Sequence, residues 1–400
     1  MTGKLRRHLL PGAPGVETLL PSDDVLLWLR AGEGVAGWGH RQRVAVGAGP
    51  ARFDRAHDAL PQTFGSIDYE EDAPPVAFGS FTFDPLSASS VLEIPEVVVH
   101  RRAGTTWAVA VESPEVTAEL KPAHGHDFRL RYAGSTVDEL EWLDAVAGAV
   151  KEIGDSALEK VVLARDLRVW SKEPFDVRIL LRRLAERFPE CYTFSCSGLV
   201  GATPELLVDR QDDEVTSLVL AGSARRGTSE DEDDAIGSEL LSSAKEVSEH
   251  LPSVGSVATV LGPLCRTFDV GQPHLLKLAN VQHIATRISG RLAEPLTALQ
   301  LAGKLHPTAA VCGAPTDAAL GAIRRLEQMD RGRYAGPVGW VDANGDGGFG
   351  IALRCMEIDG AKGRLFAGGG IVPASEPEAE LEETRLKLRA VLAALEGSSS

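Results

Sequence analysis

Residues 363–388 read GRLFAGGGIVPASEPEAELEETRLKL, and this stretch joins a predicted strand to a predicted helix. The apolar run that ends at Val372 is typical of a strand, and its three consecutive glycines allow the main chain to come close to a ligand. Ser375 and Glu378 have the spacing of a capping box, and Pro377 suits a first helical turn. The sequence therefore predicts that a helix begins directly after the strand.

The predicted helix separates its charged side chains from its apolar ones. One wedge, roughly 40° wide at about 100° per residue, holds Glu376, Glu380, Glu383 and Lys387. A different face, able to pack on a core, holds Leu381, Leu388, Leu392 and Leu395. From spacing alone, the simplest interpretation is a solvated acidic face in which Lys387 supports Glu383 at i,i+4.

Strand-like and helical segments alternate along the rest of the chain. A capped helix is predicted from Ser135, with apolar positions at Leu140, Leu143, Val146 and Val150, and another over 230–251. Strand patterns outnumber helices, and tight glycine turns such as DANGDGGFG (342–350) join several of them. We predict an α+β fold with substantial antiparallel sheet and outer helices. Its parts are an N-terminal portion (1–134), a catalytic region (135–396) and a frayed tail (397–400).

The composition excludes several classes of protein. The formal net charge is −16 over 400 residues, and basic residues form only short pairs, which argues against a nucleic-acid partner. No window approaches the roughly 18 apolar residues of a membrane helix, and the first apolar run is too short for a signal peptide. The 5 cysteines form no CxxC pair, which suits a reducing cytoplasm and argues against a thiolate zinc site.

Several segments, in a fixed order, carry a family resemblance. They are LEKVVLAR (158–165), GATPELL (201–207), LAGSARRG (220–227), LLSSAKEVSEH (240–250), LHPTAAVCGAP (305–315), YAGPVGW (334–340) and AGGGIVPASEPEAELEETRLK (367–387). Together they resemble the chorismate-utilising enzymes, the anthranilate synthase component I-like family, over residues 135–395. Within that family the chain is most similar to isochorismate synthases. The resemblance implies a chorismate-binding fold, with large antiparallel sheets packed as a sandwich inside outer helices.

The resemblance implies a reaction and a pair of catalytic residues. In isochorismate formation, water adds at ring C2 of chorismate while the C4 hydroxyl departs; by resemblance, Lys160 is the general base and Glu205 the general acid. An ordinary carboxyl is protonated in only about 1 of 500 molecules at pH 7. Burial would favour the uncharged form of both side chains, and apolar residues follow each of them. The two side chains must not form an ion pair.

The resemblance also implies Mg²⁺ as cofactor, bound by Glu249 and Glu383 with Glu380 as a direct or water-mediated partner. Mg²⁺ prefers few carboxylates together with waters and a substrate oxygen. One chorismate carboxylate would bind the metal, and the other would be held by cationic side chains and backbone N–H groups. The implied substrate-binding residues are Gly222, His283, His306, Ala310, Val311, Tyr334, Arg354, Gly368, Gly370 and Lys387.

A few positions discriminate between members of the family. Anthranilate synthases typically carry Gln in place of Lys160 and need a glutaminase, whose nucleophile motif is not visible in this sequence. Aminodeoxychorismate synthases carry a nucleophilic lysine in place of Ala221. Salicylate synthase stays open as the alternative, because Ala310 argues against it while Tyr334 and Leu353 resemble its pattern. A catalytically idle chorismate-binding subunit is a further alternative, and the presence of base, acid and ligands argues against it. We expect a monomer that needs no glutaminase partner.

Two positions depart from the family pattern. Pro252 lies three residues after Glu249, where a proline predicts a kink or an early helix end that could displace this ligand. Gly348 stands where relatives usually carry Glu.

Overall fold

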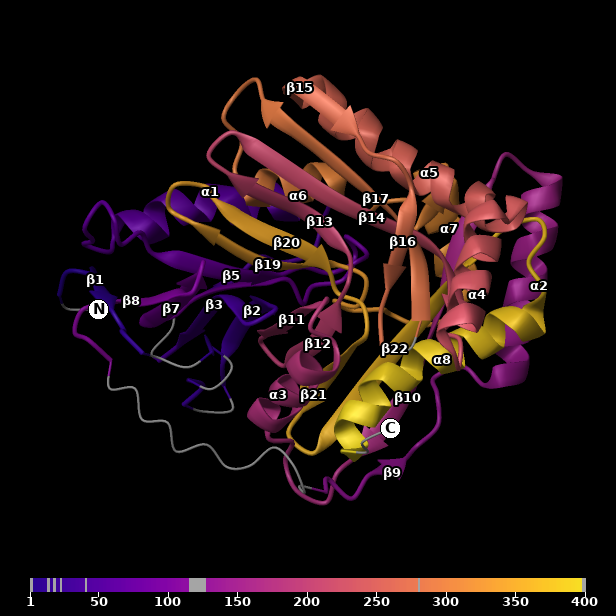
Figure 1. The fold of residues 1–400 in the computed structure, drawn as a ribbon, viewed down its shortest axis with the longest axis horizontal. Helices are drawn as coiled ribbons and strands as arrows, with labels where there is room; N and C mark the ends of the chain where they lie inside the picture. The colour runs from indigo at the N-terminus through magenta and orange to yellow at the C-terminus, as the bar shows by residue number, and fades with distance from the viewer. Residues whose placement is uncertain are drawn as a thin grey trace.

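The computed structural model describes residues 3–397 except 13–14, 17–18, 22–23, 40–41, 115–126 and 280. Most of the predicted tail, residues 398–400, lies outside the described part. The described residues form two large sheets and eight α-helices (Figure 1). All strand pairings in the two sheets are antiparallel, which confirms the predicted α+β class.

The first sheet has twelve strands, and its far end carries part of the candidate site. In spatial order the strands are β1 (Arg6–Leu9), β8 (Thr105–Ala110), β7 (Val97–Arg102), β3 (Glu33–Trp38), β2 (Leu26–Arg30), β11 (Tyr192–Cys196), β12 (Leu199–Thr203), β21 (Cys355–Asp359), β22 (Lys362–Ile371), β10 (Lys160–Trp170) and β18 (Gly313–Ala314), with β9 (Arg131–Tyr132) beside β10. β10 and β22 pair along nearly their whole length, which brings Val161 opposite Ile371. Lys160 therefore lies beside the glycine run of β22.

The second sheet has ten strands. In spatial order they are β15 (Cys265–Val270), β17 (Val281–Leu292), β14 (Glu214–Arg225), β13 (Leu206–Gln211), β20 (Gly347–Ile351), β19 (Pro337–Asp342), β5 (Val76–Ser80), β6 (Val91–Ile94) and β4 (Gln42–Ala45), with β16 (His274–Lys277) beside β17. Both sheets combine early and late strands, since β2 pairs with β11 and β5 pairs with β19. The N-terminal part thus completes both sheets.

The two sheets pack on each other as a sandwich. β2 and β11 of the first sheet contact β5 and β19 of the second. Trp28 and Phe194 from one sheet share a buried core with Phe78 and Phe349 from the other. Several strands, such as β5, β12 and β20, are buried along their whole length. The burial of their apolar side chains is the main stabilising contribution.

Helices cover the sheets from outside. They are α1 (Arg52–Gly65), α2 (Glu139–Asp155), α3 (Val177–Arg187), α4 (Glu230–Ser242), α5 (Ala244–Leu261), α6 (Ala298–Leu305), α7 (Thr316–Leu326) and α8 (Pro377–Glu396), with a short 3₁₀ turn at Gly262–Leu264. α8 packs on β22, α7 on β10 and α5 on β14. Figure 1 shows α2, α4, α7 and α8 gathered on one side of the molecule. Among the described residues, no helix combines the length and apolar character that crossing a membrane requires.

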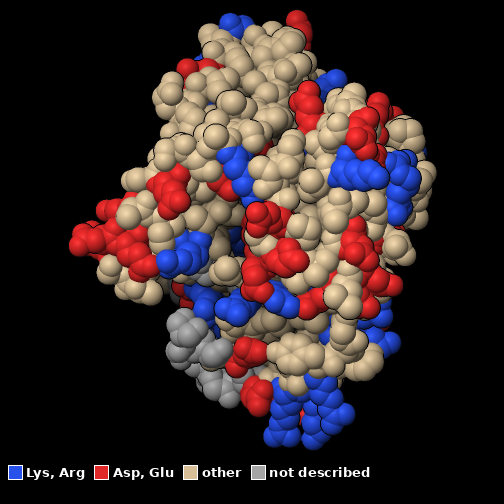
Figure 2. All heavy atoms as spheres, turned by 90° about the vertical axis from the view of Figure 1, so that its right-hand side faces the viewer, with Lys and Arg blue, Asp and Glu red and all other residues tan. Residues whose placement is uncertain are grey.

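The charged surface agrees with the acidic composition. On the face shown in Figure 2, acidic side chains are spread over the surface with basic ones between them. This face therefore presents mixed charge.

The predicted helix faces are partly confirmed. In α8 the buried positions include Leu381, Leu388 and Leu395, as the spacing predicted. The predicted capping box of Ser375 is wrong, because the N-cap is Glu376, which makes no side-chain cap hydrogen bond. The Ser375 hydroxyl instead accepts a hydrogen bond from the N–H of Val372 at 3.1 Å, so the preceding turn uses it.

Two other helices differ from their predicted form. In α2, Leu140 is 74% exposed because Trp142 takes the core position, so the prediction for Leu140 is wrong. The helix predicted over 230–251 is two helices that break at Ser243, which caps α5 through its side chain. α5 continues through Pro252 to Leu261, so the expected early end does not occur. Pro252 removes only one backbone donor, and packing of α5 on β14 stabilises the helix around it.

Candidate active site

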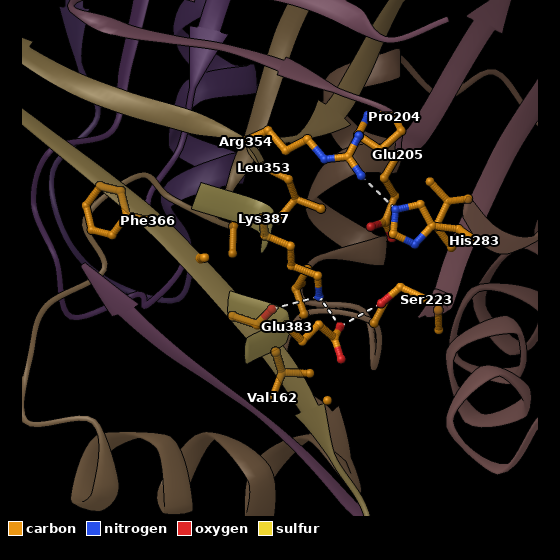
Figure 3. Close-up of a pocket in the computed structure, with 18 of the residues that line it drawn as sticks. Val162, Pro204, Glu205, Ser223, His283, Leu353, Arg354, Phe366, Glu383 and Lys387 are labelled. Atoms are coloured by element: carbon orange, nitrogen blue, oxygen red, sulfur yellow. Dashed lines mark hydrogen bonds and ion pairs between the residues drawn. The ribbon is translucent and has the colours of Figure 1, made fainter. Parts of the chain in front are cut away.

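A cavity lies where β10 and β22 of the first sheet meet β14 and β17 of the second, with α5 and α8 beside it. Among the described residues that line it are most of those predicted to bind chorismate or the metal. These are Glu205, Gly222, Glu249, His283, Ala310, Val311, Tyr334, Arg354, Gly368, Gly370, Glu383 and Lys387. They come from segments up to 182 residues apart, so only the tertiary fold brings them together (Figure 3). Lys160, His306 and Glu380 are not part of the lining.

Glu205 lies between Pro204 and the first residue of β13. Its side chain is almost fully buried, and burial raises its pKa to about 8, against the opposing charges of Lys160 and Lys387. A carboxyl with that pKa is mostly protonated at pH 7 and can donate a proton. Figure 3 shows Glu205 on the side of the cavity where His283 and Arg354 meet.

Lys160 is the first residue of β10, and its side chain is 1% exposed. The amine points toward α5, where its Nζ donates to the carbonyl of Glu249 and to Ser253 Oγ, both at 3.1 Å. Its ion-pair partner is the Glu249 carboxylate, with Nζ 3.4 Å from Oε1. Lys160 is thus paired with Glu249 and not with Glu205. The predicted neutral amine would not form this ion pair, so the role of Lys160 as base stays a prediction. It lies behind Glu249 rather than in the cavity wall.

Gly370 makes this close arrangement possible. A Cβ at this position would lie 2.0 Å from Glu249 Oε1 and 3.0 Å from Lys160 Cε. Any other residue would therefore displace both side chains. The glycine run of β22 therefore leaves room for the side chains of Lys160 and Glu249. This is in addition to its predicted role in backbone contact with the substrate.

A fixed pair, Arg354 and His283, forms one wall of the cavity. Arg354 Nη2 lies 2.7 Å from His283 Nε2, and His283 Nδ1 lies 3.2 Å from the carbonyl of Gly222. A carbonyl can only accept, so Nδ1 carries the proton and Nε2 accepts from Arg354. Burial, with the Arg354 charge, lowers the pKa of His283 to about 3, which keeps the imidazole neutral. A register shift between Ala221 and Ser223 turns the Gly222 carbonyl toward this histidine.

Two features make Arg354 suited to binding an anion. Its backbone φ is +46°, an uncommon conformation for a residue with a side chain, and such conformations concentrate at functional sites. Its guanidinium is buried, with contacts to His283 and the thiol of Cys191 but with no carboxylate partner among the described contacts. A buried guanidinium is a bidentate partner for a carboxylate.

Lys387 contributes the second cation of the cavity. Its Nζ lies 2.6 Å from Glu383 Oε1 and donates to the carbonyl of Gly368 at 2.9 Å. Burial lowers the pKa of Lys387, but the charge and hydrogen bond of Glu383 together with the charges of Glu249 and Glu380 outweigh it, so the pKa is raised and the amine stays charged. The i,i+4 pair predicted on α8 is confirmed, although it faces a cavity rather than solvent.

The ring of a ligand would meet apolar and aromatic side chains. Ala310 and Val311 line the cavity from the segment that precedes β18, and Tyr334 stacks on Phe366 with ring centroids 4.9 Å apart. His306 lies elsewhere, because its Nε2 hydrogen-bonds the carbonyl of Phe83 at 3.0 Å within the core. The predicted role of His306 in substrate binding stays a prediction, and its contacts in the structure are those of an interior histidine.

Four glutamates converge beside the cavity from α5 and α8: Glu246, Glu249, Glu380 and Glu383. Ser223 Oγ donates to Glu383 at 2.6 Å and the N–H of Ser223 donates to Glu246 at 3.2 Å, so these carboxylates share a neighbour. Burial, with repulsion by Glu249 and Glu383, raises the pKa of Glu246 to about 7. Burial and the Glu383 charge likewise raise the pKa of Glu380. We call these four residues the acidic cluster.

The acidic cluster fits a hard divalent cation. Its oxygen donors are those that Mg²⁺ prefers, and the mutual repulsion of its carboxylates is what such a cation relieves. Within the described part of the chain, no group of three or more His, Cys, Asp or Glu side chains is arranged so that it could hold a metal ion. Mg²⁺ can take fewer protein ligands and add waters and a substrate oxygen, so Glu249 and Glu383 as its ligands stay a prediction. Glu380 faces Lys245 instead of the cavity, so its place as a direct ligand stays a prediction.

Sequence reasoning missed three residues of the site. Glu246 lies three residues before Glu249, and the i,i+3 spacing on a helix was an available signal. Nothing in the sequence pointed to Ser253, because its contact with Lys160 joins α5 to the distant strand β10. Arg331 also had none: it donates to the carbonyls of Val162 (2.7 Å) and Val311 (2.9 Å), and ties β10 to the segment that lines the ring site.

Gly348, the second departure from the family pattern, lies on β20 and does not line the cavity. A Cβ there would lie 3.0 Å from Asp209 Oδ2 and 3.3 Å from Trp28 Nε1. Asp209 thus brings a carboxylate next to the place where relatives usually carry Glu.

The chain belongs to the family of chorismate binding enzymes, whose pattern matches residues 23–396. It is 38% identical to isochorismate synthase DhbC of Bacillus subtilis over 334 residues, which cover 80% of this chain and 81% of that protein. The crystal structure of DhbC from Bacillus anthracis matches with a TM-score of 0.80 and 30% identity, covering 96% of this chain and 99% of that one.

Similarity of the fold alone is also found at lower sequence identity. Anthranilate synthase component I from Streptococcus pneumoniae superimposes with a TM-score of 0.64 at 19% identity, covering 98% of this chain and 92% of that one. The predicted family and fold are therefore confirmed. The predicted enzyme class, an isomerase, is that of the isochorismate synthase relatives.

Proposed function

We propose that this enzyme is a Mg²⁺-dependent isochorismate synthase that converts chorismate to isochorismate. The observation that carries the proposal is a carboxyl, Glu205, held protonated by burial in the same cavity that Arg354 and Lys387 make cationic. The similarity to isochorismate synthases supports the same reaction. Both substrate carboxylates then have partners, one at Arg354 and one at the metal beside the acidic cluster.

The reaction requires two proton transfers on opposite sides of the ring. Lys160, in its neutral form and with its amine turned from Glu249 toward the ring, accepts a proton from water as the oxygen of that water forms its bond to ring C2. Both conjugated ring double bonds shift, the C4–O bond breaks with its electron pair leaving on oxygen, and Glu205 donates its proton to the departing hydroxyl. One water enters and one leaves, so the product is an isomer of the substrate. Solvent then exchanges the protons to restore Lys160 and Glu205.

The remaining residues bind and orient the substrate. Arg354, fixed by neutral His283, would hold one carboxylate, and Ala310, Val311 and Tyr334 would enclose the ring. Glu249 and Glu383 would hold Mg²⁺, which when bound supplies positive charge to a substrate carboxylate. Because the Glu249 carboxylate also contacts Lys160, metal binding would compete with that ion pair.

A product assay tests the proposal. The purified chain is supplied with chorismate and Mg²⁺, with a chelator as control, and the products are identified by NMR. We expect isochorismate as the main product and no turnover after chelation. Salicylate and pyruvate as the main enzymatic products would favour the alternative, for which Tyr334 and Leu353 in the cavity wall are the relevant residues. Tight chorismate binding without turnover would indicate an idle subunit.

We further propose that the chain acts as a cytoplasmic monomer without a glutaminase partner. Lys160 in place of glutamine and Ala221 in place of a nucleophilic lysine both argue against amino transfer. Size-exclusion chromatography coupled to light scattering measures the oligomeric state, and turnover of chorismate by the isolated chain measures its independence from a partner.

A further inference from the structure

Lys245, which the proposed reaction does not use, lies against the acidic cluster. Lys245 lies in the first turn of α5, directly before Glu246. Its Nζ is 3.0 Å from Glu380 Oε1 and 3.8 Å from Glu246 Oε1. The Lys245 side chain is 32% exposed, whereas that of Glu380 is 2% exposed. A partly exposed cation thus reaches from the surface to a buried carboxylate.

Lys245 differs from the two other lysines near these glutamates. Lys160 also bonds a backbone carbonyl and Ser253, and Lys387 also bonds the carbonyl of Gly368. Among the described contacts, the amine of Lys245 contacts only carboxylates of the acidic cluster. Burial lowers the pKa of Lys245, but attraction to Glu380, Glu246 and Glu383 outweighs it and keeps the amine charged. Its position is therefore set by the charge of the cluster itself.

From this geometry we propose that Lys245 is a tethered counter-ion that stabilises the metal-free acidic cluster and weakens its affinity for Mg²⁺. The inference rests on the proposed function only in assigning the metal to this cluster. A divalent cation must either displace the Lys245 amine from Glu380 or bind beside a like charge. Either event opposes metal binding. The acidic cluster therefore binds Mg²⁺ less tightly than it would without the charge of Lys245.

The size of the effect follows from elementary electrostatics. A single and a double positive charge about 6 Å apart repel, even in the dielectric of water, by an amount equal to about a tenfold change in an equilibrium constant. The lower effective dielectric near a buried carboxylate makes that value a lower bound. Removal of the Lys245 charge should therefore tighten Mg²⁺ binding at least tenfold.

The test is a calorimetric titration of the full chain with Mg²⁺ in the absence of chorismate. Lys245→Met removes the charge and keeps the aliphatic stem, and Lys245→Arg keeps the charge as the matched control. We expect a Kd at least tenfold lower for Lys245→Met and within about twofold of the native value for Lys245→Arg. Metal-free Lys245→Met should also unfold at a lower temperature than the native chain, and Mg²⁺ should restore more than the difference.

The outcomes separate this inference from the proposed function. In one outcome, the native chain binds Mg²⁺ while folded Lys245→Met binds it with an unchanged or higher Kd. That result would overturn the proposed counter-ion role of Lys245 and would leave the metal site intact. Native chain that does not bind Mg²⁺ overturns both. If Lys245→Met does not fold, Lys245→Gln is titrated in its place, and the same fall in Kd is expected because the charge is equally absent.

Discussion

Replacing Glu205 by Gln is the most informative perturbation, because one buried carboxyl links stability to catalysis. Its pKa is raised from 4.5 to about 8 by burial in the folded protein. Between those values the folded state binds a proton that the unfolded state has lost, so the free energy of unfolding falls as pH rises through this window. Gln has the shape of the protonated carboxyl and does not titrate.

The magnitude follows from the shift. One pKa unit corresponds to about 1.4 kcal/mol, so at pH 7 the 2.5 units above the unfolded value correspond to about 3 kcal/mol. The stability of Glu205→Gln relative to the native chain should therefore rise by about 3 kcal/mol between pH 4 and pH 7. It should reach a plateau of about 5 kcal/mol above pH 8. Other titrating groups are common to both proteins and cancel in the difference.

Urea unfolding at a series of pH values measures this difference. Glu378→Gln, on the exposed surface of α8, is the matched control, and its stability should stay within about 0.5 kcal/mol of the native value throughout. Turnover by Glu205→Gln should fall by about 10²–10⁴-fold, since the acid is lost. Native turnover should decline above about pH 8 as Glu205 loses its proton. A pH-independent stability difference, or near-native turnover by Glu205→Gln, would refute the reasoning.

Three other substitutions test the remaining parts of the site. Lys160→Ala should abolish turnover while chorismate binding, measured by calorimetry, persists; near-native rates would remove Lys160 as the base. Glu249→Ala should lose the Mg²⁺-dependent part of activity, and an unchanged Mg²⁺ response would contradict its assignment as a ligand. Arg331→Met should lower the free energy of unfolding by about 3–5 kcal/mol, because it leaves the buried Glu327 carboxylate unpaired. Adding Glu327→Gln should recover much of that loss in urea unfolding, and no recovery would show that the ion pair is not the cause.

The sequence predicted some residues of the site correctly and left the position of others undetermined. Arg354, Lys387, Gly222 and His283 lie at the cavity as the family motifs implied. His306 sits in an equally motif-rich segment and yet faces the core, because the side-chain direction depends on where Phe83 packs. A motif therefore located the segments of the site, whereas the direction of each side chain depended on contacts outside the motif.

By itself, the sequence determined the family and the elements whose pattern is local. The leucine spacing of α8 sets its buried face, since 3.6 residues per turn place those side chains together in any context. The tertiary structure alone decided the partners: Lys160 with Glu249, Glu380 with Lys245, and Arg331 with β10 and Val311. These pairs join residues that are far apart in the chain, so no local periodicity encodes them. Their charges and pKa values follow from burial, which exists only after the two sheets and their helices have packed.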